Sequence, residues 1–161
     1  MSGKPGDGES SDHAGVPVPP PLVFLAGLLA GIGLDALLNL GEPSTGVRIA
    51  GTVVGVIAFL YFDSAAMRSF KLAGTTPMPW RPASALVVNG PYRITRNPMY
   101  VGMGFLLTGL AFAFGALIAL AFLPVVLLVI DRVVIAREEP YLERRFGADY
   151  AEYKRQVRRW L

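Results

Sequence analysis

The fold is decided by an uncharged run, Met99–Ile130, which reads MYVGMGFLLTGLAFAFGALIALAFLPVVLLVI. About 18 consecutive apolar residues already suggest a membrane-spanning helix. As one helix the run would extend for ~48 Å at 1.5 Å per residue, whereas the hydrocarbon core of a bilayer is only about 30 Å thick. A pair of helices that turns near Gly115 fits better, and we predict spans over residues 99–115 and 116–136.

Two further apolar segments precede this run, over residues 22–40 and 47–67, and the turn Gly41–Gly46 separates them. Hydrophobic residues make up 53% of the 161-residue chain, more than a soluble domain normally carries. The sequence therefore predicts an all-α, integral membrane bundle of about four transmembrane helices. Within the first segment, Asp35 is expected to face the bundle or to lie near the membrane interface.

The ends of the chain differ from this apolar core. Residues 1–21 are rich in Gly, Ser and Pro and predict a disordered arm, which leaves residues 22–161 as the membrane domain. Residues 137–161 carry apolar and aromatic side chains at spacings near three and four, which predicts one or two amphipathic C-terminal helices. The longest connection between spans, residues 74–98, is rich in Pro and Gly and is expected to lie on the membrane surface with Trp80.

The placement of charge predicts the orientation in the membrane. Basic residues gather in residues 68–96 and 132–159, and only Lys4 and Arg48 lie elsewhere. An even number of spans puts both clusters on one side, so the positive-inside rule predicts cytosolic termini and, for a bacterial-type protein, the cell inner membrane. Because the basic residues flank spans, a nucleic-acid interface is not expected. The chain has no cysteine and one histidine, His13, which argues against a disulfide or metal site.

Small residues suggest how the helices pack. Gly27 and Gly31 are spaced four apart, as are Gly51 and Gly55. Such pairs let helices approach closely. Packing within the bundle is the favoured interpretation, and a homodimer through these faces is conceivable.

Polar residues gather at the two ends of the apolar hairpin. Tyr92, Arg93, Arg96 and Tyr100 precede or open it, and Glu138–Glu139 follows it. Charges where helices leave a membrane are costly to keep without a role. We therefore predict a functional site at the membrane surface, although each residue taken singly could only mark the membrane boundary.

Four motifs, in this order and with this apolar spacing, resemble the isoprenylcysteine carboxyl methyltransferase family, whose relatives include bacterial phospholipid methyltransferases. They are Gly90–Arg93, Arg96–Tyr100, Glu138–Glu139 and Phe146–Tyr153. The resemblance covers roughly the C-terminal half of the chain and is specific because no single motif carries it.

This resemblance implies a membrane enzyme that binds S-adenosylmethionine at the cytosolic ends of its last spans. It implies cofactor binding by Ala85, Leu86, Val87, Tyr92, Arg93, Asn97, Pro98, Met99, Tyr100 and Glu138. It implies catalytic roles for Arg96, Glu138 and Glu139. Arginine suits the cofactor's carboxylate, tyrosine faces suit a sulfonium or adenine, and Glu139 is the nearest base for an amine acceptor.

Two positions depart from the family pattern. The family's motif histidine is Asn97, which keeps hydrogen-bonding capacity but offers no imidazole base. In the prenylcysteine enzymes of the family an arginine holds the substrate carboxylate, and Val134 occupies that position here. Arg132 or Arg137 could compensate for the missing arginine.

The acceptor is therefore open between an isoprenylcysteine-like carboxylate and a lipid amine, both amphiphilic molecules that enter from the surrounding membrane lipids. The alternative function is a non-catalytic membrane scaffold or assembly protein. A small transporter is less favoured, since no internal repeat is visible.

Overall fold

The computed structural model describes residues 13–39, 41–78 and 81–161, and these residues form helices and connections without any strand. The helices are α1 (Pro20–Leu38), α2 (Thr45–Ala73), α3 (Pro98–Ala113), α4 (Ala119–Val129), α5 (Ala136–Phe146) and α6 (Ala148–Gln156). A 3₁₀ turn, Gly90–Arg93, precedes α3, and a π-helical turn, Ile130–Ile135, joins α4 to α5.

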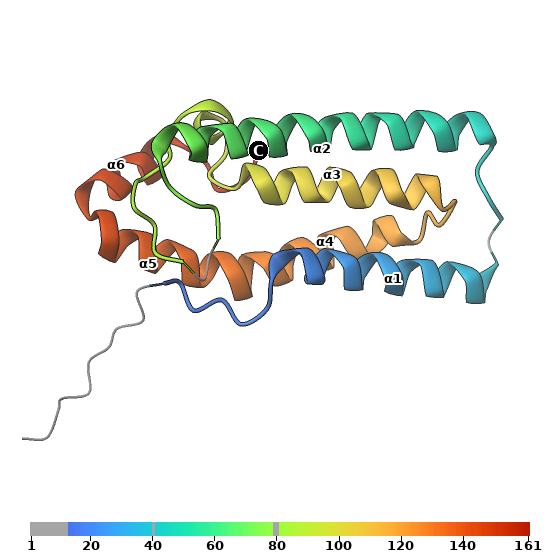
Figure 1. Cartoon of the computed structure of the whole chain (residues 1–161). Coiled ribbons are helices and arrows are strands. Elements are labelled where there is room, and N and C mark those ends of the chain that lie inside the picture. Colours follow the sequence, from blue (N-terminus) through green and yellow to red (C-terminus); the bar gives the residue numbers. More distant parts are fainter. Residues whose placement is uncertain (1–12, 40, 79–80) are drawn as a thin grey trace, which may run out of the picture.

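Helices α1 to α4 run alongside one another, while α5, α6 and the connection between α2 and α3 gather at one end (Figure 1). The turns between α1 and α2 and between α3 and α4 lie at the opposite end. Within the part of the chain that the structure describes, three helices are long and apolar enough to cross a membrane: Pro20–Leu38, Thr45–Ala73 and the continuous helix Ala119–Phe146. The remaining predicted span, residues 99–115, corresponds to α3, an apolar helix of 16 residues.

The outer surface of the bundle is apolar. Large hydrophobic side chains are exposed on α1, α2 and α4, among them Leu29, Val54, Ile57 and Leu128. A water-soluble protein rarely exposes a continuous surface of this kind. The exposed side chains fit contact with lipid tails, which agrees with the lengths of the helices.

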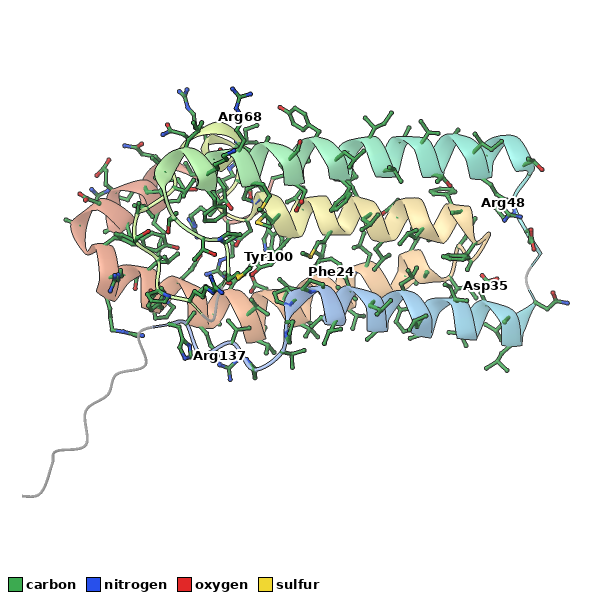
Figure 2. The ribbon with its side chains drawn as sticks, viewed as in Figure 1. Phe24, Asp35, Arg48, Arg68, Tyr100 and Arg137 are labelled. Carbon is green, nitrogen blue, oxygen red and sulfur yellow. The ribbon has the colours of Figure 1, made fainter. Side chains whose placement is uncertain are left out.

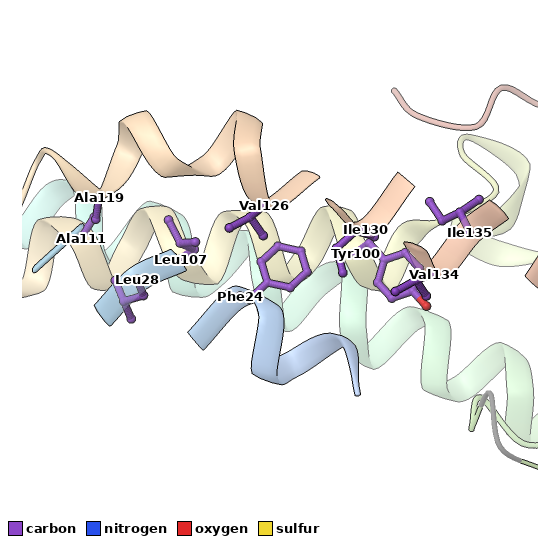
Figure 3. Close-up of a cluster of buried hydrophobic side chains, with 10 residues drawn as sticks. All are labelled: Phe24, Leu28, Tyr100, Leu107, Ala111, Ala119, Val126, Ile130, Val134 and Ile135. Carbon is purple, nitrogen blue, oxygen red and sulfur yellow. The ribbon is translucent and has the colours of Figure 1, made fainter. Parts of the chain in front are cut away.

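The interior contains two clusters of buried side chains. The first joins α1, α3 and α4 and contains Phe24, Leu28, Tyr100, Leu107, Ala111, Ala119, Val126, Ile130, Val134 and Ile135 (Figure 3). The second lies at the end that holds α6 and contains Ala66, Val87, Tyr92, Tyr150 and Tyr153. Three tyrosines in this second cluster bring polar hydroxyls into an otherwise apolar interior.

Glycines set the distances between neighbouring helices. A Cβ atom added to Gly55 of α2 would lie 2.5 Å from the Cα of Gly109 of α3, and one added to Gly31 of α1 would lie 2.3 Å from the Cα of Ala119. Gly27 and Gly51 are likewise covered, by Val126 and Phe112. The glycine faces are thus used for packing inside the chain, and they give no support to a homodimer.

Polar contacts close the end of the bundle opposite α5. Oδ1 of Asp35 accepts a hydrogen bond from the backbone N–H of Ile118 at 3.3 Å, next to the first turn of α4. Arg48 pairs with Glu42 and donates from Nη2 to the carbonyl of Ala113 at 2.7 Å, at the last turn of α3. Figure 2 shows Asp35 and Arg48 together at this end, far from Arg68 and Arg137.

Several helix ends differ from the sequence prediction. Helix α1 begins at Pro20, inside the predicted arm, and Val16 packs against the first cluster. Helix α2 continues past residue 67 to Ala73, because the charged residues near its end do not interrupt helical hydrogen bonding, and it ends where Gly74 adopts φ +66°. The turn expected near Gly115 is present, with φ +69°. Residues 1–12 of the predicted arm, Leu40 and Trp80 lie outside the described residues.

Candidate functional site

A cavity of about 290 Å³ lies at the end of the bundle where α5, α6 and the α2–α3 connection meet. This is close to the lower limit for small-molecule sites. Its walls come from Ala14, Pro20, Pro21, Phe70, Thr76, Pro77, Met78, Arg81, Ala83, Ala85, Leu86, Val87, Tyr92, Arg96, Asn97, Met99, Tyr100, Met103, Ile135, Glu138, Glu139, Tyr141, Leu142, Tyr150 and Tyr153. Residues far apart in sequence are thus brought around one space.

Most of the residues that the sequence motifs single out line this cavity. They are Ala85, Leu86, Val87, Tyr92, Arg96, Asn97, Met99, Tyr100, Glu138 and Glu139. Two do not: Pro98 is buried at the start of α3, and Arg93 is exposed on the 3₁₀ turn. A direct contact of these two side chains with a ligand in the cavity has no support in the geometry.

Tyr100 and Glu138 form a polar pair at the cavity wall. The Tyr100 hydroxyl donates to Oε1 of Glu138 at 2.8 Å. The uncharged part of the long third helix ends at Ile130, before Asp131 and Arg132, so Glu138 belongs to the charged segment that follows. Burial raises the pKa of Glu138 to about 7, while the hydrogen bond from Tyr100 acts in the opposite direction. Glu138 can therefore exchange a proton near neutral pH.

Glu139 lies in a different electrostatic setting. Its carboxylate accepts from Nη2 of Arg96 at 2.8 Å and from Nε of Arg159 at 3.1 Å. Burial alone would raise the pKa of Glu139, but the hydrogen bonds from the two arginines outweigh it, and the pKa is lowered. Glu139 is thus a buried, ionised partner of two cations, and it is a weaker base than Glu138.

Arg96 combines a structural role with one unused donor. Its Nη1 donates to the carbonyls of Val157 at 2.8 Å and Lys154 at 3.2 Å, in addition to the bond from Nη2 to Glu139. Its Nε–H is buried and has no hydrogen-bond partner among the described residues. A buried donor without an acceptor costs free energy, so this N–H fits an anionic group of a bound ligand.

The motif around Asn97 is joined to the last residues of the chain. Nδ2 of Asn97 donates to the carbonyl of Arg159 at 3.0 Å, and Oγ1 of Thr95 donates to the same carbonyl at 2.9 Å. The backbone N–H of Arg96 donates to the carbonyl of Arg158 at 2.9 Å. Asn97 therefore holds residues 158–159 against the start of α3 through a side-chain amide.

Tyrosines supply aromatic and hydroxyl groups to the cavity wall. The hydroxyl of Tyr153 donates to the carbonyl of Tyr92 at 2.7 Å, and the ring of Tyr92 meets that of Phe70 edge-on, with centroids 5.6 Å apart. Burial raises the pKa of Tyr92 and of Tyr153, so both phenols stay neutral at physiological pH. Neutral phenols offer hydrogen bonds and π faces, which suit a cation or a flat ring.

The connection between α2 and α3 is held over the cavity by α5. The hydroxyl of Tyr141 accepts from the backbone N–H of Ala83 at 2.9 Å, and Nε of Arg145 donates to the Ala83 carbonyl at 2.9 Å. The sequence does not reveal this role of Tyr141, because an aromatic residue in an amphipathic helix can either pack against its neighbours or form a tertiary hydrogen bond.

Arg159, Asp131 and Trp160 were also missed. Nη1 of Arg159 donates to Oδ1 of Asp131 at 3.1 Å, and the indole N–H of Trp160 donates to the same oxygen at 3.2 Å. In the sequence Arg159 is one of two adjacent arginines in a basic tail, and only the folded chain distinguishes them.

The two departures from the family pattern have clear positions. Val134 is fully buried in the first cluster and does not reach the cavity. Arg132 is exposed, and Arg137 is exposed and donates to the Val133 carbonyl. Neither arginine lines the cavity, so neither replaces the missing arginine there.

Comparison with known proteins gives a family assignment. The phospholipid methyltransferase family profile matches residues 47–149. A protein of Haemophilus influenzae, described as an uncharacterized protein, is 56% identical over 45 residues, which are 27% of this chain and 71% of the relative. No solved structure matches the chain. Because the family match covers more than half of the sequence, including α2, α3, α4 and the glutamate pair, this chain belongs to the phospholipid methyltransferase family of membrane methyltransferases.

Proposed function

We propose that this protein transfers a methyl group from S-adenosylmethionine to a lipid amine at the cytosolic face of the bacterial inner membrane. The proposal rests on the family match and on one observation above all: Glu138 and Arg96 line the same cavity. Burial raises the pKa of Glu138 to about 7, and the buried Nε–H of Arg96 has no partner among the described residues. A base near neutrality and a free donor for an anion are the two polar requirements of this chemistry.

The residues present fit the cofactor. The Arg96 Nε–H is suited to its carboxylate, and the faces of Tyr92 and Tyr100 are suited to its sulfonium or adenine. When bound, S-adenosylmethionine supplies a methyl group on a positively charged sulfur. The side chains of Ala85, Leu86 and Val87 add an apolar wall on the side of the α2–α3 connection.

Glu138 is the proposed general base. A lipid amine must lose a proton to become a nucleophile, and a carboxylate with a pKa near the working pH accepts it most effectively. Tyr100 orients the carboxylate by its hydrogen bond of 2.8 Å. The nitrogen lone pair then forms the new N–C bond as the S–C bond breaks, and Glu138 retains the proton. Glu139, ionised between two arginines, keeps Arg96 in place.

An amine is favoured over a carboxylate acceptor by the environment of Val134. The arginine expected to hold a prenylcysteine carboxylate is replaced by a valine buried in the apolar core, and Arg132 and Arg137 lie away from the cavity. A carboxylate acceptor also needs no base, which would leave the raised pKa of Glu138 without a use.

The orientation follows from the charges. Residues 68–96, which comprise the end of α2 and the α2–α3 connection, and residues 132–159 together carry 13 of the 15 basic residues, and they meet at the cavity end of the bundle (Figure 2). The positive-inside rule assigns that end to the cytosol, together with both termini. The apolar wall of the cavity suits an acceptor that arrives from the lipid between helices, with α3 as a fourth, shorter span and α5–α6 as amphipathic helices at the surface.

The test is calorimetric binding of S-adenosylhomocysteine and S-adenosylmethionine to the purified protein in nanodiscs, followed by transfer of a labelled methyl group to phosphatidylethanolamine or to a prenylcysteine. We expect micromolar binding and labelling of the amine lipid. Folded protein that binds neither ligand would overturn the enzyme assignment in favour of a membrane scaffold. Labelling of the prenylcysteine alone would overturn the choice of acceptor.

A further inference from the structure

Arg159 contacts two polar segments of the site: the one that carries Arg96 and Asn97, and the one that carries Glu138 and Glu139. Its side chain contacts two carboxylates: Nε donates to Oε1 of Glu139 at 3.1 Å, and Nη1 donates to Oδ1 of Asp131 at 3.1 Å. Asp131 belongs to the π-helical turn and Glu139 to α5, two turns further along the same continuous helix. One guanidinium thus spans the segment that carries Glu138.

The backbone carbonyl of Arg159 binds the segment that carries Arg96 and Asn97. The carbonyl of Arg159 accepts from Oγ1 of Thr95 at 2.9 Å and from Nδ2 of Asn97 at 3.0 Å. Thr95 is fully buried, so its hydroxyl depends on this acceptor. The motif that carries Arg96 and Asn97 is therefore fixed to residue 159 from one side, and the glutamate pair is fixed to it from the other.

The burial of the partners indicates which contact matters most. The side chain of Glu139 is only 9% exposed and that of Arg159 is 36% exposed. Because Glu139 is buried, losing one of its two cationic partners is more disruptive than losing a surface ion pair. Without Arg159, Arg96 would be the remaining cation bound to Glu139. Its guanidinium would then move toward that carboxylate.

We propose that Arg159 is a positioning residue, which holds the Arg96–Asn97 motif and the Glu138–Glu139 pair in register around the cavity. The inference rests on the proposed function, since it assigns residue 159 to the support of the same site. It adds a role for a side chain that does not line the cavity. A loss of register of about 1 Å can cost ~100-fold in rate.

Arg158 provides a matched control. Its side chain is exposed, and in the described contacts it offers only its backbone carbonyl, which a substitution leaves in place. Arg159→Gln and Arg158→Gln remove the same charge from neighbouring positions. Arg159→Lys keeps the charge but loses the planar fork that reaches two carboxylates at once. Asp131→Asn weakens the anchor on the π-helical turn and leaves Glu139 intact.

The experiment measures two quantities on the full chain in nanodiscs: the Kd of S-adenosylhomocysteine, and hydrogen exchange of the amides of residues 95–97 without ligand. We expect Arg159→Gln to raise the Kd about tenfold or more and to speed exchange at Arg96. Arg158→Gln should change neither. Arg159→Lys should fall between, and Asp131→Asn should have no further effect in the Arg159→Gln background.

Each result either supports or overturns the positioning role of Arg159. Equal behaviour of Arg159→Gln and Arg158→Gln, or full recovery with Arg159→Lys, would overturn the positioning role. If Arg159→Gln does not fold, Arg159→Lys and Asp131→Asn carry the test, and wild-type affinity in both overturns the proposal. Failure of the wild type itself to bind would overturn the proposed function and this inference with it, whereas binding by the wild type with no difference among variants would overturn this inference alone.

Discussion

The hydroxyl of Tyr100 donates a 2.8 Å hydrogen bond to Glu138, and this contact joins the first turn of α3 to the charged end of the third long helix, Ala119–Phe146. It links two residues separated by the whole apolar hairpin. Burial keeps the carboxyl of Glu138 near a pKa of about 7, and the phenol limits the rise by stabilising the ionised form.

Replacing Tyr100 with Phe should move the pH dependence of methyl transfer upward. Transfer by the wild type should rise with pH through about 7, as Glu138 becomes ionised. The groups near Glu138 are the hydroxyls of Tyr100 and Tyr92 and the carboxylate of Glu139. Losing the hydrogen bond from Tyr100 removes the interaction that lowers the pKa of Glu138, so this pKa should rise. Rate–pH profiles measure the shift, and Tyr61→Phe on the exposed face of α2 is the control.

Glu138→Gln should reduce the rate of transfer by about 100-fold or more, within the usual contribution of a positioned base. The amide keeps the size of the side chain and can still accept from Tyr100, so the helix contact should survive. Single-turnover rates in nanodiscs measure the effect. A rate within threefold of the wild type would remove Glu138 from the role of base.

Acidification should loosen residues 157–161. The pKa of Glu139 is lowered in the folded protein, so its ion pairs contribute stability above the ordinary carboxyl pKa of 4.5. That stability is lost as the pH falls through the lower, folded-state pKa. Trp160 reports on the segment by fluorescence once Trp80 is replaced by Phe, since the chain has two tryptophans. In Glu139→Gln the transition should disappear.

Gly55→Ala should destabilise the bundle by about 1–3 kcal/mol, the usual cost of overpacking. The added methyl would meet backbone atoms of Gly109 and Phe105 on α3, which cannot move aside as a side chain does. Gly33→Ala on α1 is the control, because nothing lies within 4 Å of its added Cβ. Thermal unfolding in one detergent compares the two, and equal midpoints would contradict the close contact.

Asp35→Ala should cost about 1 kcal/mol, as loss of a capping side chain does, and should leave the affinity for S-adenosylhomocysteine unchanged. Asp35 bonds to the N–H of Ile118 at the end of the bundle opposite the cavity. Combined melting and binding measurements check this separation. Weakened binding would mean that the two ends are coupled.

The sequence predicts much of this arrangement because hydropathy, charge and glycine act locally. The length of the run 99–130 requires a turn, and Gly115 provides it. Glycine also marks the end of α2, where Gly74 adopts a positive φ. The motif residues around Tyr92, Tyr100 and Glu138 do gather at one cavity.

Other features depend on partners that no local pattern reveals. Glu138 and Glu139 are identical in type and adjacent, yet one lies beside a phenol and the other between two arginines, so their pKa values move in opposite directions. Arg158 and Arg159 are equally indistinguishable in sequence. The exposure of Arg93 could not be predicted either, because a 3₁₀ turn sets the direction of its side chain.

The contacts of Asp35 and Arg48 also bear on how substrates come and go. Asp35 of α1 bonds to the backbone of the α3–α4 turn, and Arg48 of α2 bonds to the last residue of α3. Helices α2 and α3 are also in contact without intervening side chains at Gly55. The bundle is thus fastened at the end opposite the cavity. With these helix ends joined, a lipid acceptor is expected to enter at the cavity end of the bundle rather than past the α1–α2 and α3–α4 turns.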